Sequence, residues 1–453
     1  MTSLALRRAL GVEPAVGAVL LTRLLPVLAA PATMWLVATR RPLAEQGFYV
    51  ILQNVQALAQ LAELGLGALV VQFVAHESPT LGWADDGGLI GKTRTLDRIA
   101  EFLPAALRWY TRAALALLLA LLAGWMLFHA EARESGVAVA GPWASVVVAT
   151  ALYLLLIPLI CLAEGAGLLV TVQRVRSTQA LAAVGALWLG ILAYDALWGM
   201  ALFAVVWLAV PLAWLFHAHR GLLRQAVHWI RHPHANADAT TALSARYSGV
   251  QRRTAASSLA LWAAPQSLAP ALLVFHGAAA AGRAGFSLAL ATAPVTLGTA
   301  WLFARYPRLG AHVATGDMAA RDALARRAMS QALAVCALLS AVVTAAVAVL
   351  YLVAPTLATR VMPAAATGAL AAAALGWVAI QGWAAWLRAE RQEPLTVAIV
   401  SGSLIVIGAT VGFAAVSDAR TTVAAYALAV LAAAAPLAAV SFSRVRRGTR
   451  TAA

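Results

Sequence analysis

The stretch that decides the fold runs from Leu61 to Glu77 and reads LAELGLGALVVQFVAHE. It overlaps an apolar run from Phe48 to Ala75, which is long enough to cross a bilayer. Glu63 lies near the middle of this run, where an ionised carboxylate costs about 2.5 to 3.5 kcal/mol on insertion scales. The small residues Gly65 and Gly67 follow it and would let another helix approach closely. We therefore expect this helix to line a polar path through the membrane.

The composition of the chain is that of a polytopic membrane protein. Of its 453 residues 62% are hydrophobic and only 11% are charged, and the mean hydropathy is +0.81. The N-terminus carries Arg7 and Arg8 but no apolar core that ends in a small-residue cleavage site. We expect the first hydrophobic segment to remain as a spanning helix. Cys161 and Cys336 both fall inside apolar runs, and we interpret them as buried small residues.

Hydropathy predicts an all-α polytopic membrane protein with about twelve transmembrane helices. This count takes about 20 apolar residues for each span. Six spans are expected near residues 15–39, 48–75, 109–129, 144–172, 179–194 and 197–216. Six more are expected near residues 254–275, 285–304, 329–353, 367–387, 395–416 and 422–443.

The distribution of basic residues supports this count and orients the chain. With both termini in the cytoplasm, 26 of the 33 Lys and Arg residues fall on the inner side and 6 on the outer side. The outer residues are Arg40, Arg41, Arg133, Arg283, Arg360 and Arg420. The net charge of +15 is thus mostly a topology signal, and we expect no nucleic-acid partner.

A polar connection divides the predicted spans into two groups of six. Residues 217–253 are basic and rich in His, and we interpret them as a solvated cytoplasmic linker between an N-terminal lobe, 1–216, and a C-terminal lobe, 254–453. Two six-helix lobes around a central cavity are the usual plan of transporters built from repeats. The His spacing matches no compact metal motif. P-loop, GxSxG and HExxH motifs are also missing from the sequence, so we expect neither ATP hydrolysis nor proteolysis, and no cofactor or metal.

Arg23 is a basic residue inside the first predicted span. It lies between pairs of leucines, and Pro26 and Pro31 follow, which predicts a kinked and partly unwound helix. A guanidinium in a water-filled cavity can hold a phosphate or pyrophosphate through two parallel hydrogen bonds. The alternative is that the span begins later and Arg23 reaches the inner headgroups.

Two carboxylates are further candidates for the transport path. Glu63 is the natural partner of Arg23, and an ion pair, a protonatable coupling site and a neutral packed acid all stay open. Glu164 is followed by Gly165 and Gly167, which echoes the residues after Glu63. Its alternative role is an ion pair with Arg174 or Arg176.

Gln266 is a polar candidate in the seventh predicted span. Pro265, Pro270 and Pro294 predict breaks in the seventh and eighth helices. Broken helices near the midplane of a transporter can expose backbone groups to a substrate, although they often only shape packing.

Three patches of the sequence resemble one transporter family. They are EQGFYVILQNVQALAQLAELGLGALVVQFVAHE (45–77), GLIGKTRTLDRIAEFLPAALRWY (88–110) and WLFARYPRLGAHVATGDMAARDALARR (301–327). All three resemble the polysaccharide and O-antigen flippases of the multidrug/oligosaccharidyl-lipid/polysaccharide (MOP) exporter superfamily. Elsewhere the likeness is one of hydropathy alone.

The resemblance implies a function at the bacterial cytoplasmic (inner) membrane. A flippase of this family moves an undecaprenyl-pyrophosphate-linked oligosaccharide from the inner to the outer leaflet by alternating access, for lipopolysaccharide and other surface polysaccharides. Its partners would be that lipid-linked substrate, membrane lipids and other polysaccharide-assembly membrane proteins. Arg23 matches the cavity arginines of the family, and Arg305 is the nearest basic residue in the second lobe. The coupling ion, a proton or sodium, stays open.

Three other functions compete with a flippase. Another exporter of the same fold would carry drugs or a peptidoglycan precursor. A membrane glycosyltransferase or polymerase would need acidic residues on a substantial outer loop, whereas the first outer loop spans only Arg40 to Gly47. A scaffold or channel would not require charges at Arg23 and Glu63 together. We therefore expect a transporter and not an enzyme.

Overall fold

The structure is a computed structural model, which describes the larger part of the chain. The described residues are 29–62, 66–232, 253–303, 305, 309, 312–313, 315–388 and 393–451.

The chain forms two compact units. The first unit comprises Met1–Arg41, Leu52–Ala130 and Ala138–Ser248. The second comprises Pro42–Ile51, Glu131–Val137 and Gly249–Ala453. The expected lobe boundaries, 1–216 and 254–453, stay a prediction, and the units differ from them in assigning two short segments of the first half to the second unit.

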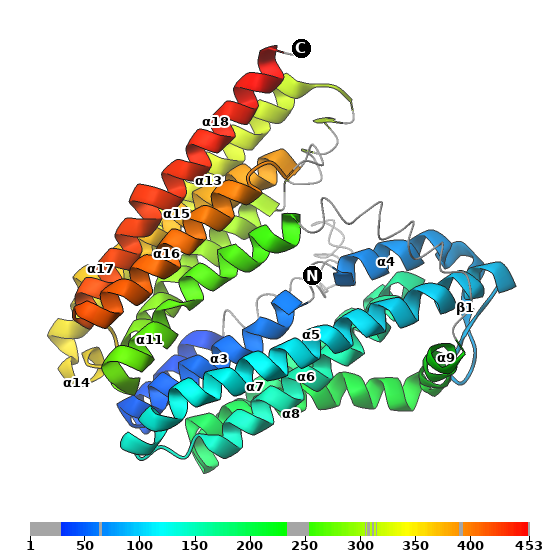
Figure 1. Ribbon diagram of the computed structural model, residues 1–453, viewed down its shortest axis with the longest axis horizontal. Coiled ribbons are helices and arrows are strands. Elements are labelled where there is room, and N and C mark those ends of the chain that lie inside the picture. The colour runs from blue at the N-terminus through cyan, green and yellow to red at the C-terminus, as the bar shows by residue number, and fades with distance from the viewer. Residues whose placement is uncertain are drawn as a thin grey trace, which may run out of the picture. The chain divides into compact units, whose positions relative to one another are not determined.

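In its described residues the first unit is helical apart from one small hairpin and short turns (Figure 1). After the helical residues 29–40, its elements are α3 (Leu43–Ala62, whose first residues belong to the second unit), α4 (Leu66–Glu77), η1 (Ser78–Thr80), β1 (Leu81–Trp83), β2 (Leu89–Gly91), α5 (Thr93–Glu134, whose last residues belong to the second unit), α6 (Ala140–Ala163), η2 (Glu164–Leu168), α7 (Leu169–Ala193), α8 (Ala196–Ala218) and α9 (Arg220–Arg231).

The described residues of the second unit form helices joined by short turns. Its elements, after the helical residues 253–266, are α11 (Leu268–Phe303), α13 (Met318–Val353), α14 (Pro355–Ala358), α15 (Ala364–Arg388), α16 (Thr396–Val416), α17 (Ala419–Ala429), η3 (Val430–Ala434) and α18 (Ala435–Thr451). The helices α13, α15, α16 and α18 run alongside one another in Figure 1.

The long apolar helices are those expected of a chain that lies in a lipid bilayer. Hydrocarbon offers no hydrogen bonds, so every backbone group of a spanning segment must be satisfied internally. Eight described helical stretches are long and apolar enough to cross a membrane. Two of them, Ala140–Ala193 and Arg253–Thr296, each contain a sharp break, at Gly167 and Gly277 respectively. Each therefore supplies two of the predicted spans.

The break at Gly277 replaces a predicted loop. Hydropathy places a connection between residues 275 and 285, but the chain is helical on both sides of Gly277. Gly277 has a φ of 82°, which favours glycine, and Oε1 of Glu131 accepts a 2.7 Å hydrogen bond from the N–H of Ala278. The carboxylate satisfies the first free donor, so the helix restarts at once. The loop prediction is wrong here, and Arg283 lies on a helix.

The start of α3 is held inside the second unit by a buried amide. Gln46 is fully buried, and its Nε2 donates to the carbonyl oxygens of Gly282 at 2.9 Å and Arg360 at 2.8 Å. Next to it, a Cβ at Gly47 would overlap the carbonyl group of Ala278. The two backbones therefore approach as closely as only glycine allows.

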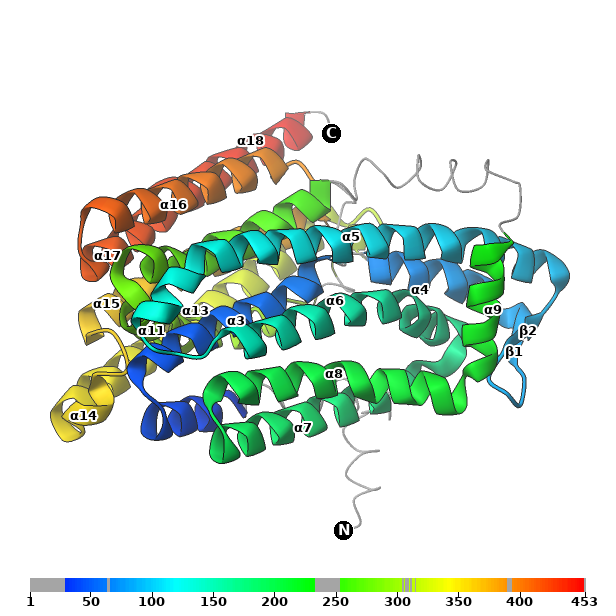
Figure 2. The ribbon, with the colours of Figure 1, turned by 60° about the horizontal axis from the view of Figure 1, so that its bottom comes forward.

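A small hairpin and α9 close one end of the first unit. β1 and β2 pair antiparallel before α5 begins at Thr93. Gln225 of α9 exchanges two hydrogen bonds with the backbone of Leu89, at 2.8 and 2.9 Å. Figure 2 shows α9 lying crosswise to α8, beside the hairpin. The residues 220–231, interpreted as part of a solvated linker, thus form a packed helix.

His219 packs between the hairpin and the end of α8. Its ring lies between Trp83 and Trp214, with centroids 4.9 and 4.6 Å away, and the residue is buried. Burial lowers the pKa of His219, although the backbone carbonyl of Gly87 acts in the opposite direction. The imidazole is therefore neutral at pH 7 and is part of the packing.

An ion-pair network joins α13 to α18. The carboxylate of Asp322 accepts hydrogen bonds from Arg321 and Arg446, including one of 2.9 Å from Nη1 of Arg446. The guanidinium of Arg446 also lies over the ring of Trp386, 4.7 Å from its centroid. Burial alone would raise the pKa of Asp322, but the hydrogen bonds from the two arginines outweigh it and lower the pKa.

Replacing Gly47 with Ala should destabilise the protein, because the added Cβ has no space against Ala278. We expect a loss of about 1 to 3 kcal/mol, seen as a lower Tm of the purified protein in detergent. Gly408→Ala is the matched control, since Gly408 also lies in a helix but has open space around its Cβ position. Equal Tm values for the two variants would contradict this packing.

Replacing Asp322 with Asn should also lower the Tm, by an amount equivalent to about 1 to 3 kcal/mol, because two arginines lose their carboxylate. A lowered pKa stabilises the folded state above the ordinary pKa of the carboxyl group, and this contribution is lost as the pH falls through the folded-state value. The difference between wild type and variant should therefore shrink below about pH 4. A difference that stays constant down to pH 3 would argue against the network.

Candidate functional site

The two charged residues expected in the transport path lie outside the described residues. Arg23 precedes residue 29, and Glu63 falls between the end of α3 at Ala62 and the start of α4 at Leu66. Their roles, and their pairing with each other, stay predictions.

Glu164 takes part in an ion pair within the first unit. Its Oε2 lies 2.8 Å from Nη2 of Arg176, and its Oε1 accepts a weaker 3.4 Å hydrogen bond from Gln173. The Glu164 side chain is only 12% exposed, and that of Arg176 is 33% exposed. The structure thus places Glu164 in the ion pair that the sequence offered as the alternative to a substrate contact.

The glycines after Glu164 explain why its partner is so close. α6 ends at Ala163, and the chain turns at Gly167, which has a φ of 96°, before α7 begins. Gly165 packs against α4, where a Cβ would lie 2.8 Å from the carbonyl oxygen of Val71. The sequence placed Glu164 well inside a span that continues to residue 172, and this boundary is wrong because Gly167 reverses the chain. Arg176 therefore lies on the returning helix.

Gln266 and Arg305 both belong to the second unit. Gln266 is half-buried and directly precedes a turn at Ser267, whose hydroxyl donates to the carbonyl of Ala264 at 2.8 Å. Arg305 is also half-buried, and its backbone N–H donates to the carbonyl of Leu302 at 3.1 Å. Neither residue is among those that line the pocket of the second unit.

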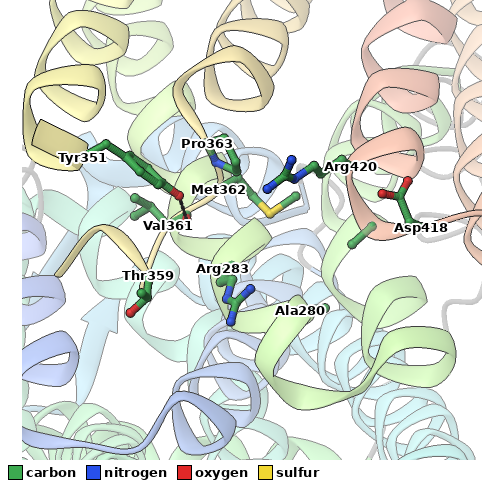
Figure 3. A pocket seen from close by; sticks show the side chains of 10 residues that line it. Ala280, Arg283, Tyr351, Thr359, Val361, Met362, Pro363, Asp418 and Arg420 are labelled. Carbon is green, nitrogen blue, oxygen red and sulfur yellow. Dashed lines mark hydrogen bonds between the residues drawn. The ribbon is translucent and has the colours of Figure 1, made fainter. Parts of the chain in front are cut away.

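A pocket of about 350 Å³ opens in the second unit, at the helix ends that the charge distribution assigns to the outer side. Its residues come from α11, α13, the segment after α14, and α17, and they are Ala280, Arg283, Tyr351, Thr359, Val361, Met362, Pro363, Asp418, Ala419 and Arg420. Figure 3 shows Arg283, Tyr351 and Arg420 reaching this pocket from three different helices. Its volume falls in the lower range of small-ligand sites.

The polar groups of the pocket are only partly satisfied by one another. The hydroxyl of Tyr351 donates to the carbonyl of Val361 at 3.0 Å. The positive charges of Arg283 and Arg420 both interact with the phenol group of Tyr351. Oδ1 of Asp418 accepts a 2.9 Å hydrogen bond from the N–H of Thr421 and so caps α17. Hydrogen bonds from Thr421, and then the charge of Arg420, lower the pKa of Asp418, so this carboxylate is ionised at pH 7.

Sequence reasoning missed this pocket. It assigned Arg283 and Arg420 to separate outer loops, and nothing in their spacing connects them. A signal was present, however. Few basic residues fall on the predicted outer side, and three of the six, Arg283, Arg360 and Arg420, lie in predicted outer connections of the second half.

The chain has the fold of MOP-superfamily transporters. No protein-family profile and no curated protein matches its sequence. Among solved structures, it is similar to an inward-facing multidrug resistance MATE family transporter of the MOP superfamily, with 14% identity, 95% of this chain and 96% of that chain covered, and a TM-score of 0.58. A MOP superfamily transporter from Pyrococcus furiosus matches with 14% identity, 96% of each chain covered and a TM-score of 0.55. A MATE transporter of Vibrio cholerae matches with 13% identity, 96% of each chain covered and a TM-score of 0.52.

These likenesses confirm the fold class that hydropathy predicts. The chain is an all-α polytopic membrane protein with about twelve transmembrane helices, and the match extends over nearly its whole length.

Replacing Glu164 with Gln should lower the Tm modestly, by the equivalent of about 1 kcal/mol, because Arg176 is partly exposed and water screens the pair. Exchanging the charges, with Glu164→Arg and Arg176→Glu together, should recover part of this loss. Glu134→Gln removes an exposed carboxylate from the end of α5 and is the matched control. A charge exchange that destabilises more than the sum of its single changes would show that the pair does not stabilise this turn.

Proposed function

We propose that the protein is a MOP-type exporter that moves an undecaprenyl-pyrophosphate-linked oligosaccharide from the inner to the outer leaflet of the bacterial cytoplasmic membrane by alternating access. The observation that carries the transporter part of this proposal is the fold, which matches MOP-superfamily transporters over 95% of the chain. The oligosaccharide part rests on the three sequence patches that resemble flippases.

The physical demands of this substrate fit the features of the chain. A lipid-linked glycan has a polar head that cannot cross hydrocarbon unaided, whereas its prenyl tail can remain in lipid. A cation inside the membrane is therefore needed for the diphosphate, and Arg23 in the first predicted span is the residue that we assign to it. Glu63 balances this charge or carries the coupling proton.

A second exporter function competes with the flippase. One of the similar solved structures is a multidrug resistance MATE family transporter, and the same fold serves that protein. A drug or a peptidoglycan precursor is therefore the alternative cargo. Cargo is decided by the lining of the path and not by the fold, so the two functions must be separated by a transport assay.

The purified protein in liposomes should move a lipid-linked oligosaccharide between leaflets without changing its mass. The measurement is the fraction of glycan that becomes accessible to a probe outside the vesicles, together with mass spectrometry of the recovered lipid. Arg23→Ala should reduce the rate at least about tenfold, since one charge-assisted contact is worth about 1.5 to 3 kcal/mol. Arg40→Ala, which removes an exposed arginine near the end of the same predicted span, should leave the rate unchanged.

Each contrary outcome has a separate meaning. Transport of cationic drugs without transport of the glycan would favour the alternative cargo, and a changed mass of the lipid would indicate an enzyme. Equal rates for Arg23→Ala and Arg40→Ala would remove Arg23 from the mechanism.

A further inference from the structure

The lining of the pocket in the second unit has an excess of positive charge. Arg283 and Arg420 line it and are both exposed, while Asp418 is its single lining carboxylate among the described residues. That carboxylate already caps α17 through the N–H of Thr421. At least one guanidinium is therefore left with donors that are directed to the space of the pocket or to water.

The position of Arg420 is unfavourable for the helix on which it lies. It is the second residue of α17, directly after Ala419, and the positive end of a helix dipole disfavours a cation there. An anion in the pocket would be attracted by the guanidinium of Arg420 and by the helix dipole together. A bound anion would then offset the destabilisation of α17 by the charge of Arg420.

Arg360 adds a third cation to the neighbourhood of the pocket. It lies in the chain between the lining residues Thr359 and Val361, and burial lowers its pKa, although arginine stays charged at pH 7. Its Nη1 is buried and has no hydrogen-bond partner among the described residues. The carbonyl of the same residue is held by Gln46, so this segment has a defined position in the second unit.

We infer that this pocket binds a phosphate-bearing ligand, with the guanidinium groups of Arg283 and Arg420 as its two principal contacts. Planar guanidinium groups that arrive from two helices suit the several oxygens of a phosphate or diphosphate. The hydroxyl oxygen of Tyr351 donates its proton to Val361 and keeps its lone pairs, so it does not supply a further donor. The ligand is either a free phosphate compound or the phosphate of a lipid headgroup.

A substitution of Asp418 tests anion binding by an expected gain of affinity, which a misfolded protein would not give. Asn is as good an N-cap as Asp, so Asp418→Asn keeps the cap of α17 and removes only the negative charge. If the pocket binds an anion, this variant should bind it several-fold more tightly than the wild type. If Arg283 and Arg420 serve only as solvated surface residues, Asp418→Asn should change nothing.

The experiment measures binding of inorganic pyrophosphate to the full-length purified protein in detergent, by isothermal titration calorimetry at low salt. Arg283→Gln and Arg420→Gln together should weaken binding at least about tenfold, and Asp418→Asn should tighten it. Arg133→Gln is the matched control, because it removes an exposed arginine of the second unit that does not line the pocket.

A second arm distinguishes the source of the phosphate. The protein is placed in nanodiscs of phosphatidylcholine with added dodecyl phosphate, and pyrophosphate competes for the site. Retention of the lipid phosphate against excess pyrophosphate would indicate a headgroup ligand, and its displacement would indicate a free phosphate compound. The inference is overturned if the wild type does not bind either probe, or if Asp418→Asn and the double arginine variant both bind as the wild type does. Because neither arm requires transport, the outcome is independent of the proposed flippase activity.

Discussion

The second unit depends on one buried amide. Gln46 joins α3, α11 and the segment before α15, which are far apart in the sequence, through two hydrogen bonds of its Nε2. A buried amide without partners is costly, so these contacts allow a single register of α3 against α11. Gly47 and Gly282 allow the backbones of α3 and α11 to approach closely at this point. The first unit uses the same principle where Gly165 packs against α4.

Most of the fold could be predicted from the sequence, because the bilayer dictates the length of apolar segments. The breaks at Gly167 and Gly277 could not. Both need a positive φ, and many glycines in membrane helices serve packing instead. The turn at Gly277 also needs the carboxylate of Glu131, which lies 147 residues before Ala278 in the sequence. Hydropathy does not contain this information.

In the candidate site, the sequence could predict a contact only where the two residues lie near each other along the chain. Glu164 and Arg176 meet across one turn, and the sequence already offered that pair as an alternative. The arginine pocket joins Arg283, Tyr351 and Arg420, which lie on three helices, and only tertiary packing brings them together. The patches that resemble flippases also contain residues with structural contacts. Gln46 and Asp322, which hydrogen-bond to other helices, both lie in these patches.

The turn at Gly277 has a consequence for how such a chain can diverge. A connection of one residue, anchored by a carboxylate from another helix, leaves no stretch of backbone in which an insertion could be accommodated. By contrast, the turn at Gly136 has open space around it. Relatives that acquire longer loops or additional domains on this side would therefore gain them next to Gly136, while the turn at Gly277 keeps its length.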